Sequence, residues 1–374
     1  MSEPATQPLP AGVLVELPAA ELVGAAPAAI RRWIDAAAAA RIPEADGTLA
    51  TAREIAEAAA LHAMADNTRR AYRAGIRAWC DFCAAHGLGV LPAQPVDVAS
   101  FLADQRVPAK PRPPVAMNTL KLRLAAIAYL HHAAGLPSPT DAACVTATLR
   151  GFRRMAVAQN EAPQQKLAAR IELIREMVAA IGETPGELRD RALLLVGFAG
   201  AFRRAELARI ECRHLELTEH GYRVTLPASK GDRSFDGVTI GIPYGTSELC
   251  PVRALRRWLA ASQITDGPVF RRIWATARPR TAGDAWQPVL VVGEKPLDPG
   301  SIARIVKARG AAIGIEPDLL GGHSLKRGAM NTAKDRRVHP AQLKQLGRHK
   351  SYATLGAYLE EGDLFENNAL AGVL

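Results

Sequence analysis

The chain has 374 residues, of which 48% are hydrophobic, so it is long enough to build two folded domains and too apolar to be largely disordered. Lysine and arginine exceed aspartate and glutamate by ten, which suits a polyanionic partner, although a high isoelectric point alone also fits an ordinary soluble protein. No apolar run reaches membrane-spanning length, and the first residues lack the basic region of a secretory signal. The five cysteines are an odd number spread over a long chain, which does not indicate a disulfide framework. We therefore expect a cytoplasmic location and no membrane partner.

The first 60 residues differ in composition from the rest of the chain. They are rich in alanine and proline and hold four basic and eight acidic residues, whereas residues 61–164 hold 12 and six, and residues 165–374 hold 31 and 23. Helix-prone stretches at 28–40 and 50–65 leave open whether this segment packs as a small helical arm or stays partly mobile. We therefore expect an N-terminal arm over 1–60, followed by strongly basic folded parts.

A helical domain is predicted over residues 61–160. Its first helix, from Asn67, places apolar residues at helical spacing on one face, at Tyr72, Ile76, Trp79 and Cys83. Another face of the same helix carries a basic stripe made of Arg69, Arg73 and Arg77. Such a row can be a solvated surface or can bind DNA phosphates, and we favour phosphate contact.

Two further helices complete this domain, over 118–134 and 142–156, after a proline-rich loop at 107–114. Their outer faces add basic residues that we also expect to contact DNA, namely Lys121, Arg123, Arg150, Arg153 and Arg154. The polar segment 161–168, which contains a proline, then reads as a linker between domains.

Three residues of the first helix could form part of a metal site, but packing in the core is the favoured interpretation. Cys80, Cys83 and His86 have a three-residue spacing that is compatible with part of such a site. Both cysteines, however, continue the apolar face of the helix, and no second group of ligands follows nearby. We therefore expect core packing here, and no bound metal or cofactor in the protein.

The remaining residues, 169–374, predict a mixed α and β domain. An apolar helix over 189–200 leads into a turn that carries Arg203, and strands over 222–227 and 238–243 form a hairpin whose loop carries Lys230. Further helices are predicted at 251–261, 301–313, 324–337, 341–346 and 352–361, the last with Ser351 as its N-cap. The fold class is therefore mainly α, with a small antiparallel hairpin or sheet in the C-terminal domain.

Four short segments of this domain carry candidate chemistry, and they are Gly200–Leu207, Ala228–Asp232, Gly322–Gly328 and Gly347–Tyr358. They combine basic and imidazole side chains with a phenol, Tyr358, nine residues after His349. Their order and spacing resemble the tyrosine recombinase (phage integrase) family over roughly residues 61–374. No single segment is specific, but the series is.

The resemblance implies a two-domain DNA clamp, in which an α-helical core-binding (SAM-like) domain is joined to an α+β catalytic domain. It implies site-specific recombination through a covalent 3′-phosphotyrosine, without metal or ATP, on double-stranded DNA with inverted-repeat half-sites. It also implies a dimer on each site and a tetramer in synapsis, linked by exchange of the C-terminal tail 359–374. The protein would then be associated with the nucleoid.

The resemblance also implies a catalytic set, which comprises Tyr358 as the nucleophile, Arg203, Lys230, His323, Lys326 and His349, with Glu206 in support of Arg203. Cations are needed because a pentavalent phosphorus carries extra negative charge on its oxygens. Lys230 is the expected general acid for the leaving 5′-oxygen, and His323 could accept the phenolic proton.

One position departs from the family pattern. Lys326 stands where the family has its second arginine, and Arg327, one residue later, points about 100° away on a helix. Lysine presents one compact ammonium instead of a planar fork, which predicts a weakened enzyme. Two alternatives therefore remain open. One is a DNA-binding protein of mobile-element origin with little or no activity, and the other is a type IB topoisomerase, which uses the same kind of catalytic mechanism as the recombinases.

Overall fold

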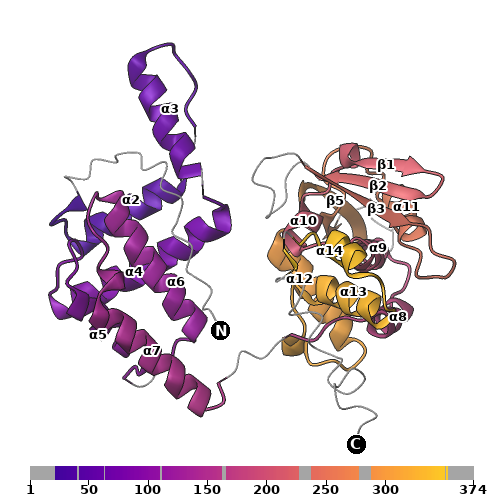
Figure 1. Ribbon diagram of the computed structural model, residues 1–374. Helices are drawn as coiled ribbons and strands as arrows, with labels where there is room; N and C mark the ends of the chain where they lie inside the picture. Colours follow the sequence, from indigo (N-terminus) through magenta and orange to yellow (C-terminus); the bar gives the residue numbers. More distant parts are fainter. Residues whose placement is uncertain are drawn as a thin grey trace, which may run out of the picture. The chain divides into compact units, whose positions relative to one another are not determined.

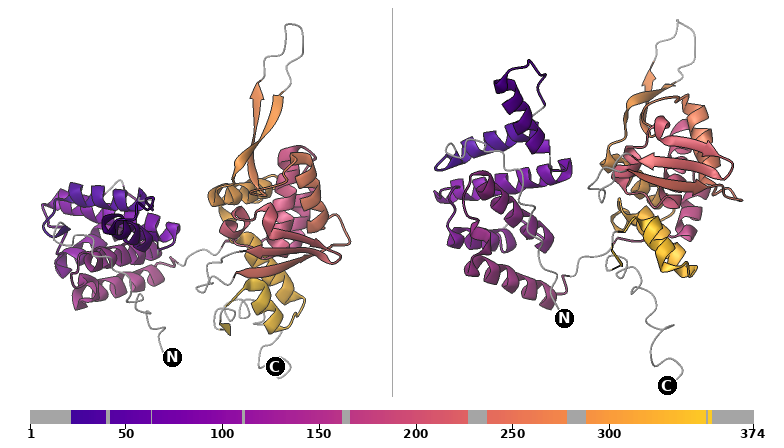
Figure 2. Two further views of the ribbon diagram at one scale, coloured as in Figure 1. Left: turned by 90° about the horizontal axis from the view of Figure 1, so that it is seen from above. Right: turned by 45° about the horizontal axis from the view of Figure 1, so that its top comes forward.

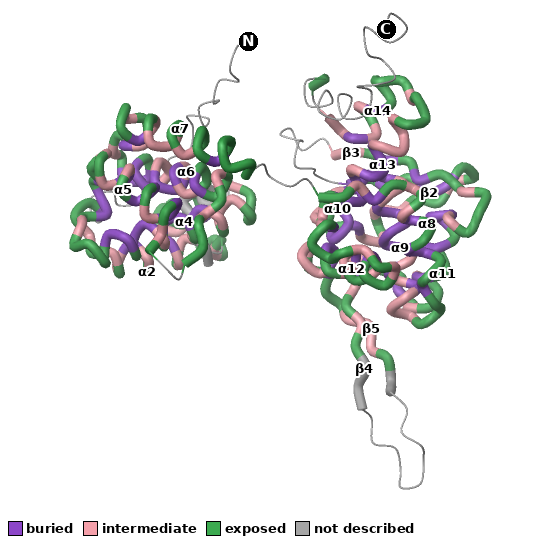
Figure 3. The backbone as a smooth tube through the Cα atoms, turned by 90° about the horizontal axis from the view of Figure 1, so that it is seen from below, coloured by how far each residue is buried: buried purple, intermediate pink, exposed green. Residues whose placement is uncertain are grey.

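A computed structural model of the protein describes residues 22–39, 42–62, 64–109, 112–161, 166–226, 237–277, 288–349 and 351–352. The chain divides into two compact units, 1–163 and 164–374, each with its own hydrophobic core (Figures 1 and 3). Both the mainly α fold class and the small antiparallel sheets predicted from the sequence are confirmed.

The first unit is helical throughout its described part. Its α-helices are α2 (Pro27–Ala39), α3 (Leu49–His62), α4 (Asp66–His86), α5 (Pro95–Arg106), α6 (Met117–Ala133) and α7 (Ala143–Ala158), with a 3-10 turn η1 (Pro139–Asp141) before α7. Pro95 opens α5 at a position where a helix does not need the missing N–H. Gly87 ends α4 with a φ of 64°, a conformation that glycine adopts without steric cost.

The core of this unit forms around Trp79. Its ring lies 5.4 Å from that of Phe101, and its indole N–H donates to the Val90 carbonyl at 3.2 Å, so the only polar atom of the side chain is satisfied. Helices α4 and α6 pack closely at Gly75, where an added Cβ would lie 2.7 Å from Cβ of Ala126. The apolar stripe predicted for the first helix is confirmed, because all four of its members are buried.

The N-terminal segment contributes to the same core. Helix α2 packs against α4 (Figure 1), and its Ile30 and Ile34 are buried there. The segment expected as a separate arm thus includes a helix that belongs to the body of the first unit. Cys80 and Cys83 are also fully buried, and burial raises their pKa to about 11 and about 12, so both remain protonated thiols that pack in the core.

The second unit combines helices with two antiparallel sheets. Its helices are α8 (Ile171–Ala179), α9 (Pro185–Ala199), α10 (Arg204–Ala208), α11 (Pro251–Ser262), α12 (Pro299–Ala311), α13 (Ser324–Asp335) and α14 (Pro340–Gly347), with 3-10 turns η2 (Cys212–His214) and η3 (Pro317–Leu319). Its strands are β1 (Leu215–Thr218), β2 (Gly221–Leu226), β3 (Val238–Pro243), β4 (Arg271–Ala277) and β5 (Pro288–Pro296).

The two predicted strands are confirmed as β2 and β3, which pair antiparallel with Val224 opposite Ile240. A third strand, β1, pairs with β2 on its other side. Strands β4 and β5 form a separate hairpin that projects from the second unit (Figure 2). These last three strands were not predicted, since β1 has four residues of which none is buried, and no described residue of β4 or β5 is fully buried.

Helix α9 is the central element of the second unit (Figure 3). Leu193, Leu194 and Val196 are buried together with Trp258 of α11, whose indole N–H donates to the Val269 carbonyl at 2.8 Å. The helix begins with a capping box, in which Glu187 accepts from the backbone N–H and the hydroxyl of Thr184. The C-terminal end of α9 leads into the turn that carries Arg203.

Candidate active site

Arg203 is positioned by a tight turn between α9 and α10. The chain turns through Gly200 and Ala201, which has a φ of 43°, and Phe202 is fully buried below the turn. Glu206 is then the third residue of α10, where a carboxylate can accept from the N–H of the cap residue. It accepts from the Arg203 backbone N–H at 2.8 Å and from the Arg203 guanidinium at 2.7 Å, which explains why these residue types occur three positions apart.

Glu206 is a buried carboxylate shared by two guanidinium groups. It is 5% exposed, and its second partner is Arg348, which donates to Oε2 at 2.7 Å. Burial favours the neutral acid, but Arg348 and Arg203 together hold the pKa of Glu206 below its ordinary value. The carboxylate is therefore ionised at neutral pH, and it fixes one edge of the Arg203 guanidinium while 24% of that side chain stays exposed.

Lys326 lies beside this pair, on the first turn of α13. The side chain is 3% exposed, and its ammonium donates to the Gly347 carbonyl at the end of α14, at 2.5 Å. Burial, together with the positive charges of Arg203 and Arg348, lowers the pKa of Lys326 to about 7, although the Glu206 carboxylate acts in the opposite direction. Arg327 does not take its place, because its guanidinium donates to the Lys166 carbonyl on another side of the helix.

His349 follows the end of α14. Its backbone N–H donates to the Lys344 carbonyl at 3.0 Å, and a Cβ on Gly347 would lie 2.2 Å from the imidazole, so the ring needs glycine at that position. Burial and the charges of Lys326, Arg203 and Arg348 lower the pKa of His349, which makes a neutral imidazole the main form at neutral pH.

The structure thus brings four of the predicted site residues together, namely Arg203, Glu206, Lys326 and His349. His323 is the cap residue of α13, three positions before Lys326, and is exposed. Lys230, Tyr358 and the tail 359–374 lie outside the described residues, as does the helix predicted over 352–361 except for its first residue.

Arg348 is the site residue that sequence reasoning missed. Its side chain is 7% exposed, and it bonds the turn before Arg203 as well as Glu206. The one signal in the sequence is an arginine directly after the helix-ending Gly347, which by itself is indistinguishable from a surface residue.

The basic residues predicted to contact DNA have different surroundings in the first unit. Arg73 and Arg77 both donate to Asp35 of α2, at 2.6 Å and 3.1 Å from their Nε atoms, and Arg69 pairs with Asp66. Most of the others project from the unit, and these are Lys121 of α6 and Arg150, Arg153 and Arg154 of α7. Arg123 is partly buried, and burial lowers its pKa. The stripe on α4 is therefore partly neutralised within the protein, which the sequence did not reveal.

Comparison with known proteins adds the relatives of this chain. It is 34% identical over 310 residues to the integrase/recombinase XerD homolog of Selenomonas ruminantium, and the match covers 82% of this chain and 85% of the relative. Residues 59–135 match the family model for the phage integrase N-terminal SAM-like domain. The chain belongs to the tyrosine recombinase family.

More distant recombinases show the same relationship. The Cre recombinase of Escherichia phage P1 is 25% identical over 210 residues, which is 55% of this chain and 58% of Cre. Among solved structures, XerH bound to its palindromic difH substrate in a post-cleavage complex has a TM-score of 0.58 at 12% identity, covering 92% of this chain and 95% of XerH. The Tn1549 transposon integrase with circular intermediate DNA reaches 0.51, also at 12% identity, covering 83% and 94%. At these identities the structural likeness shows the fold.

The described part of this recombinase contains neither a candidate metal site nor a membrane-spanning helix. Its residues there contain no group of three or more histidine, cysteine or acidic side chains that could hold a metal ion. None of the helices in the same ranges is both long and apolar enough to cross a membrane.

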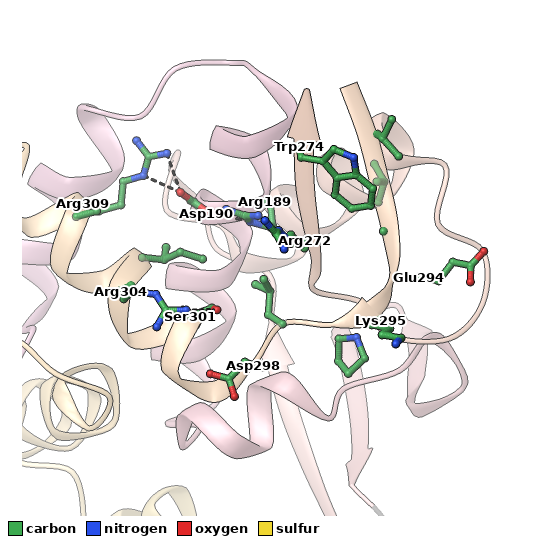
Figure 4. Close-up of a pocket in the computed structure, with 17 residues that line it drawn as sticks. Arg189, Asp190, Arg272, Trp274, Glu294, Lys295, Asp298, Ser301, Arg304 and Arg309 are labelled. Atoms are coloured by element: carbon green, nitrogen blue, oxygen red, sulfur yellow. Dashed lines mark hydrogen bonds and ion pairs between the residues drawn. The ribbon is translucent and has the colours of Figure 1, made fainter. Parts of the chain in front are cut away.

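A second polar region of this recombinase lies at the base of the β4–β5 hairpin (Figure 4). A pocket of about 1290 Å³ opens between the start of α9, the hairpin and α12. The 40%-exposed Trp274 lies against Gly293 of the neighbouring strand, where a Cβ would be 2.9 Å from the ring. At its floor the buried Asp190 accepts two bonds from Arg189, at 2.9 and 2.7 Å, and two from Arg309, at 2.9 and 2.7 Å.

We expect Asp190→Asn to lower the free energy of unfolding by about 2–3 kcal/mol, because an amide leaves two partly buried guanidinium groups without their charged acceptor. Denaturant unfolding of the full chain measures this change. Glu216→Gln is the matched control, since Glu216 pairs with Arg223 at 2.9 Å on the surface and should cost under about 1 kcal/mol. Equal effects of the two substitutions would contradict a structural role for Asp190.

Proposed function

We propose that this recombinase cuts and rejoins DNA at specific sites through a covalent 3′-phosphotyrosine at Tyr358, independently of metal and ATP. The observation that carries the proposal is the buried cluster in which Arg203, Lys326 and Arg348 surround the single carboxylate of Glu206. Two permanently charged guanidinium groups and a partly charged lysine against one carboxylate leave a positive field beside the partly exposed Arg203. Such a field stabilises the transition state of phosphodiester cleavage, in which the phosphate gains negative charge.

The proposed catalytic residues bind the phosphate or transfer protons in this reaction. Arg203 binds non-bridging phosphate oxygens with the edge of its guanidinium that Glu206 leaves unused. The imidazoles of His323 and His349 donate to the same phosphate or accept the phenolic proton, and Lys230 protonates the leaving 5′-oxygen. The covalent phosphotyrosine conserves the energy of the phosphodiester, so a 5′-hydroxyl can displace Tyr358 and reseal the strand without ATP.

The proposed substrate is double-stranded DNA with inverted half-sites. XerH and the Tn1549 integrase were solved with DNA, which supports the same class of partner for this chain. In this proposal residues 61–160 form the core-binding domain, 169–374 form the catalytic domain, and 161–168 link them so that they clamp the duplex. Two protomers would occupy a site and four would form the synapse, joined by the tail 359–374.

Covalent capture on a nicked duplex tests the function. A nick placed near the cleavage site releases a short fragment after attack, so the 5′-hydroxyl needed for rejoining is lost and the adduct accumulates. The full-length protein is incubated with DNA from inverted repeats that flank its own gene, in EDTA and without ATP, and separated under denaturing conditions. A DNA-linked protein band supports the proposal, and its absence at saturating protein rejects it.

One observation favours a second function, a DNA-binding protein with little activity. With a pKa of about 7, Lys326 is only partly charged at neutral pH, whereas an arginine would carry a full charge there. Saturable DNA binding without any adduct would support this binder. Relaxation of supercoiled DNA without strand exchange would instead support a type IB topoisomerase.

Asp35 allows the predicted DNA contacts of α4 to be tested. Asp35→Asn removes the carboxylate that occupies Arg73 and Arg77, so we expect tighter DNA binding and a steeper salt dependence, by roughly one unit in the slope of log K against log salt for each phosphate gained. Fluorescence anisotropy with labelled duplex at several salt concentrations measures both. Asp141→Asn, at an exposed position on the same unit, controls for the change in net charge. An unchanged slope for Asp35→Asn would show that these arginines serve only the packing of α2.

A further inference from the structure

Arg348 has an unusual backbone conformation for its residue type. It ends α14 with φ 51° and ψ 48°, the left-handed region that glycine adopts without steric cost and that other residues occupy only with backbone strain. Other interactions must therefore hold it there. Because the following residue is His349, the direction of the chain at Arg348 decides where the imidazole lies.

The Arg348 side chain supplies those interactions. Its guanidinium donates to the Gly200 carbonyl at 2.7 Å, to the Ala201 carbonyl at 2.6 Å and to Oε2 of Glu206 at 2.7 Å. It also lies 5.3 Å from the ring centroid of Phe202. These acceptors and this ring all belong to the turn that carries Arg203 or to the first turn of α10. One side chain thus joins the end of α14 to the element that bears the phosphate-binding arginine.

The two oxygens of Glu206 have separate partners. Oε1 accepts from the Arg203 guanidinium, whereas Oε2 accepts from the Arg203 backbone N–H and from Arg348. Arg348 therefore holds the carboxylate in the rotation that orients Arg203. A planar fork is needed for this, because its acceptors lie in different directions and a lysine ammonium could not reach them all.

We propose that Arg348 is a positioning residue for strand cleavage, which fixes the Arg203 turn against the peptide that carries His349. The residue acts without contacting DNA, since its side chain is almost wholly buried and its terminal nitrogens already donate to Gly200, Ala201, Leu346 and Glu206. This inference rests on the proposed function and adds to it a residue that belongs to neither the nucleophile nor the phosphate-binding set.

Single-turnover cleavage of the nicked duplex tests the role with two full-length variants, Arg348→Gln and Arg348→Lys. We expect the rate at saturating DNA to fall roughly ten- to hundredfold in both, as for loss of one or two charge-assisted hydrogen bonds, while the Kd for DNA stays within about twofold. The control is Arg213→Gln, which removes another Arg–Glu pair of 2.7 Å. Because Arg213 is 75% exposed, this variant should cleave DNA at the unmodified rate.

The pH dependence of the rate separates positioning from simple loss of folding. Among the residues that the structure describes, the charged groups Arg348, Arg203 and Glu206 act on Lys326, and the first two act with Lys326 on His349. Loss of the Arg348 charge should raise the pKa of both groups, so the pH profile of Arg348→Gln shifts upward while that of Arg348→Lys stays near the original. A merely destabilised protein would keep the original profile at a reduced amplitude.

The outcomes distinguish this role from the proposed function. If the unmodified protein forms an adduct and both Arg348 variants form it equally fast, the positioning role is rejected and the function stands. The role is also rejected if the rate falls only in proportion to DNA binding or to the folded fraction seen by calorimetry. If the unmodified protein forms no adduct, the proposed function fails and this role fails with it.

Discussion

Tyr358→Phe is expected to abolish the covalent protein–DNA adduct while DNA binding persists. Phenylalanine lacks the oxygen that would form the phosphoester bond. The loss in cleavage rate should therefore be on the order of 10⁴-fold or more, as expected for a missing nucleophile. The measurement is the fraction of labelled duplex that stays attached to protein after denaturation.

Tyr352→Phe is the matched control for this experiment. Tyr352 is the other phenol of the Gly347–Tyr358 segment, is 55% exposed, and has its ring 4.7 Å from the Lys344 ammonium. That contact involves the ring face and survives the loss of the hydroxyl, so this variant should form the adduct at the unmodified rate. An adduct that persists in Tyr358→Phe and disappears in Tyr352→Phe would identify Tyr352 as the nucleophile and contradict our assignment.

Most of the helices were predictable because their signal is local, although α5 and α8 were not predicted. Four apolar residues spaced along α4 indicate a buried face, whatever the partner is. The helix predicted over 189–200 begins earlier, at Pro185, where Thr184 and Glu187 form a capping box that the prediction did not use. The pairing of Arg203 with Glu206 has the same origin, since three residues separate them on one turn of helix. Family resemblance then drew attention to residues whose individual motifs are weak.

The features that escaped prediction depend on contacts between distant segments. Arg348 bonds Gly200 and Ala201 across almost 150 positions, and Asp35 neutralises Arg73 and Arg77 from a segment that composition alone described as an arm. No periodicity records such pairs. The β4–β5 hairpin was missed for a related reason, because a hairpin that projects from its unit has little core to impose alternation.

Lys326 illustrates why residue type alone did not settle the chemistry of the site. From the sequence alone, its replacement of an arginine predicts the loss of one phosphate contact. The structure shows a second consequence, because the ammonium is buried against the Gly347 carbonyl and close to two guanidinium groups that cannot lose their charge. A lysine can become neutral in such surroundings, whereas an arginine cannot.

This difference predicts that the stability of the second unit rises with pH. The pKa of Lys326 is about 7 in the folded protein and near 10.5 when unfolded, so between these values the unfolded chain binds one proton more than the folded one. The free energy of unfolding should then increase by up to about 1.4 kcal/mol per pH unit, or roughly 2 kcal/mol from pH 7 to pH 9, and its pH dependence disappears below pH 7, where both states hold the proton.

Calorimetric unfolding of the full chain and of Lys326→Met at pH 7, 8 and 9 measures this effect, since other titrating groups cancel in the difference between the two proteins. We expect the midpoint of the second unit to rise relative to that of the variant by several degrees across this range, because about 1 kcal/mol corresponds to 2–4 °C for a unit of this size. Lys307→Met is the control, since Lys307 forms a surface pair with Asp318 at 2.9 Å and should keep the pH dependence of the unmodified chain. A constant difference between the unmodified chain and Lys326→Met would mean that Lys326 keeps its proton in the folded state, and with it a full positive charge for the phosphate.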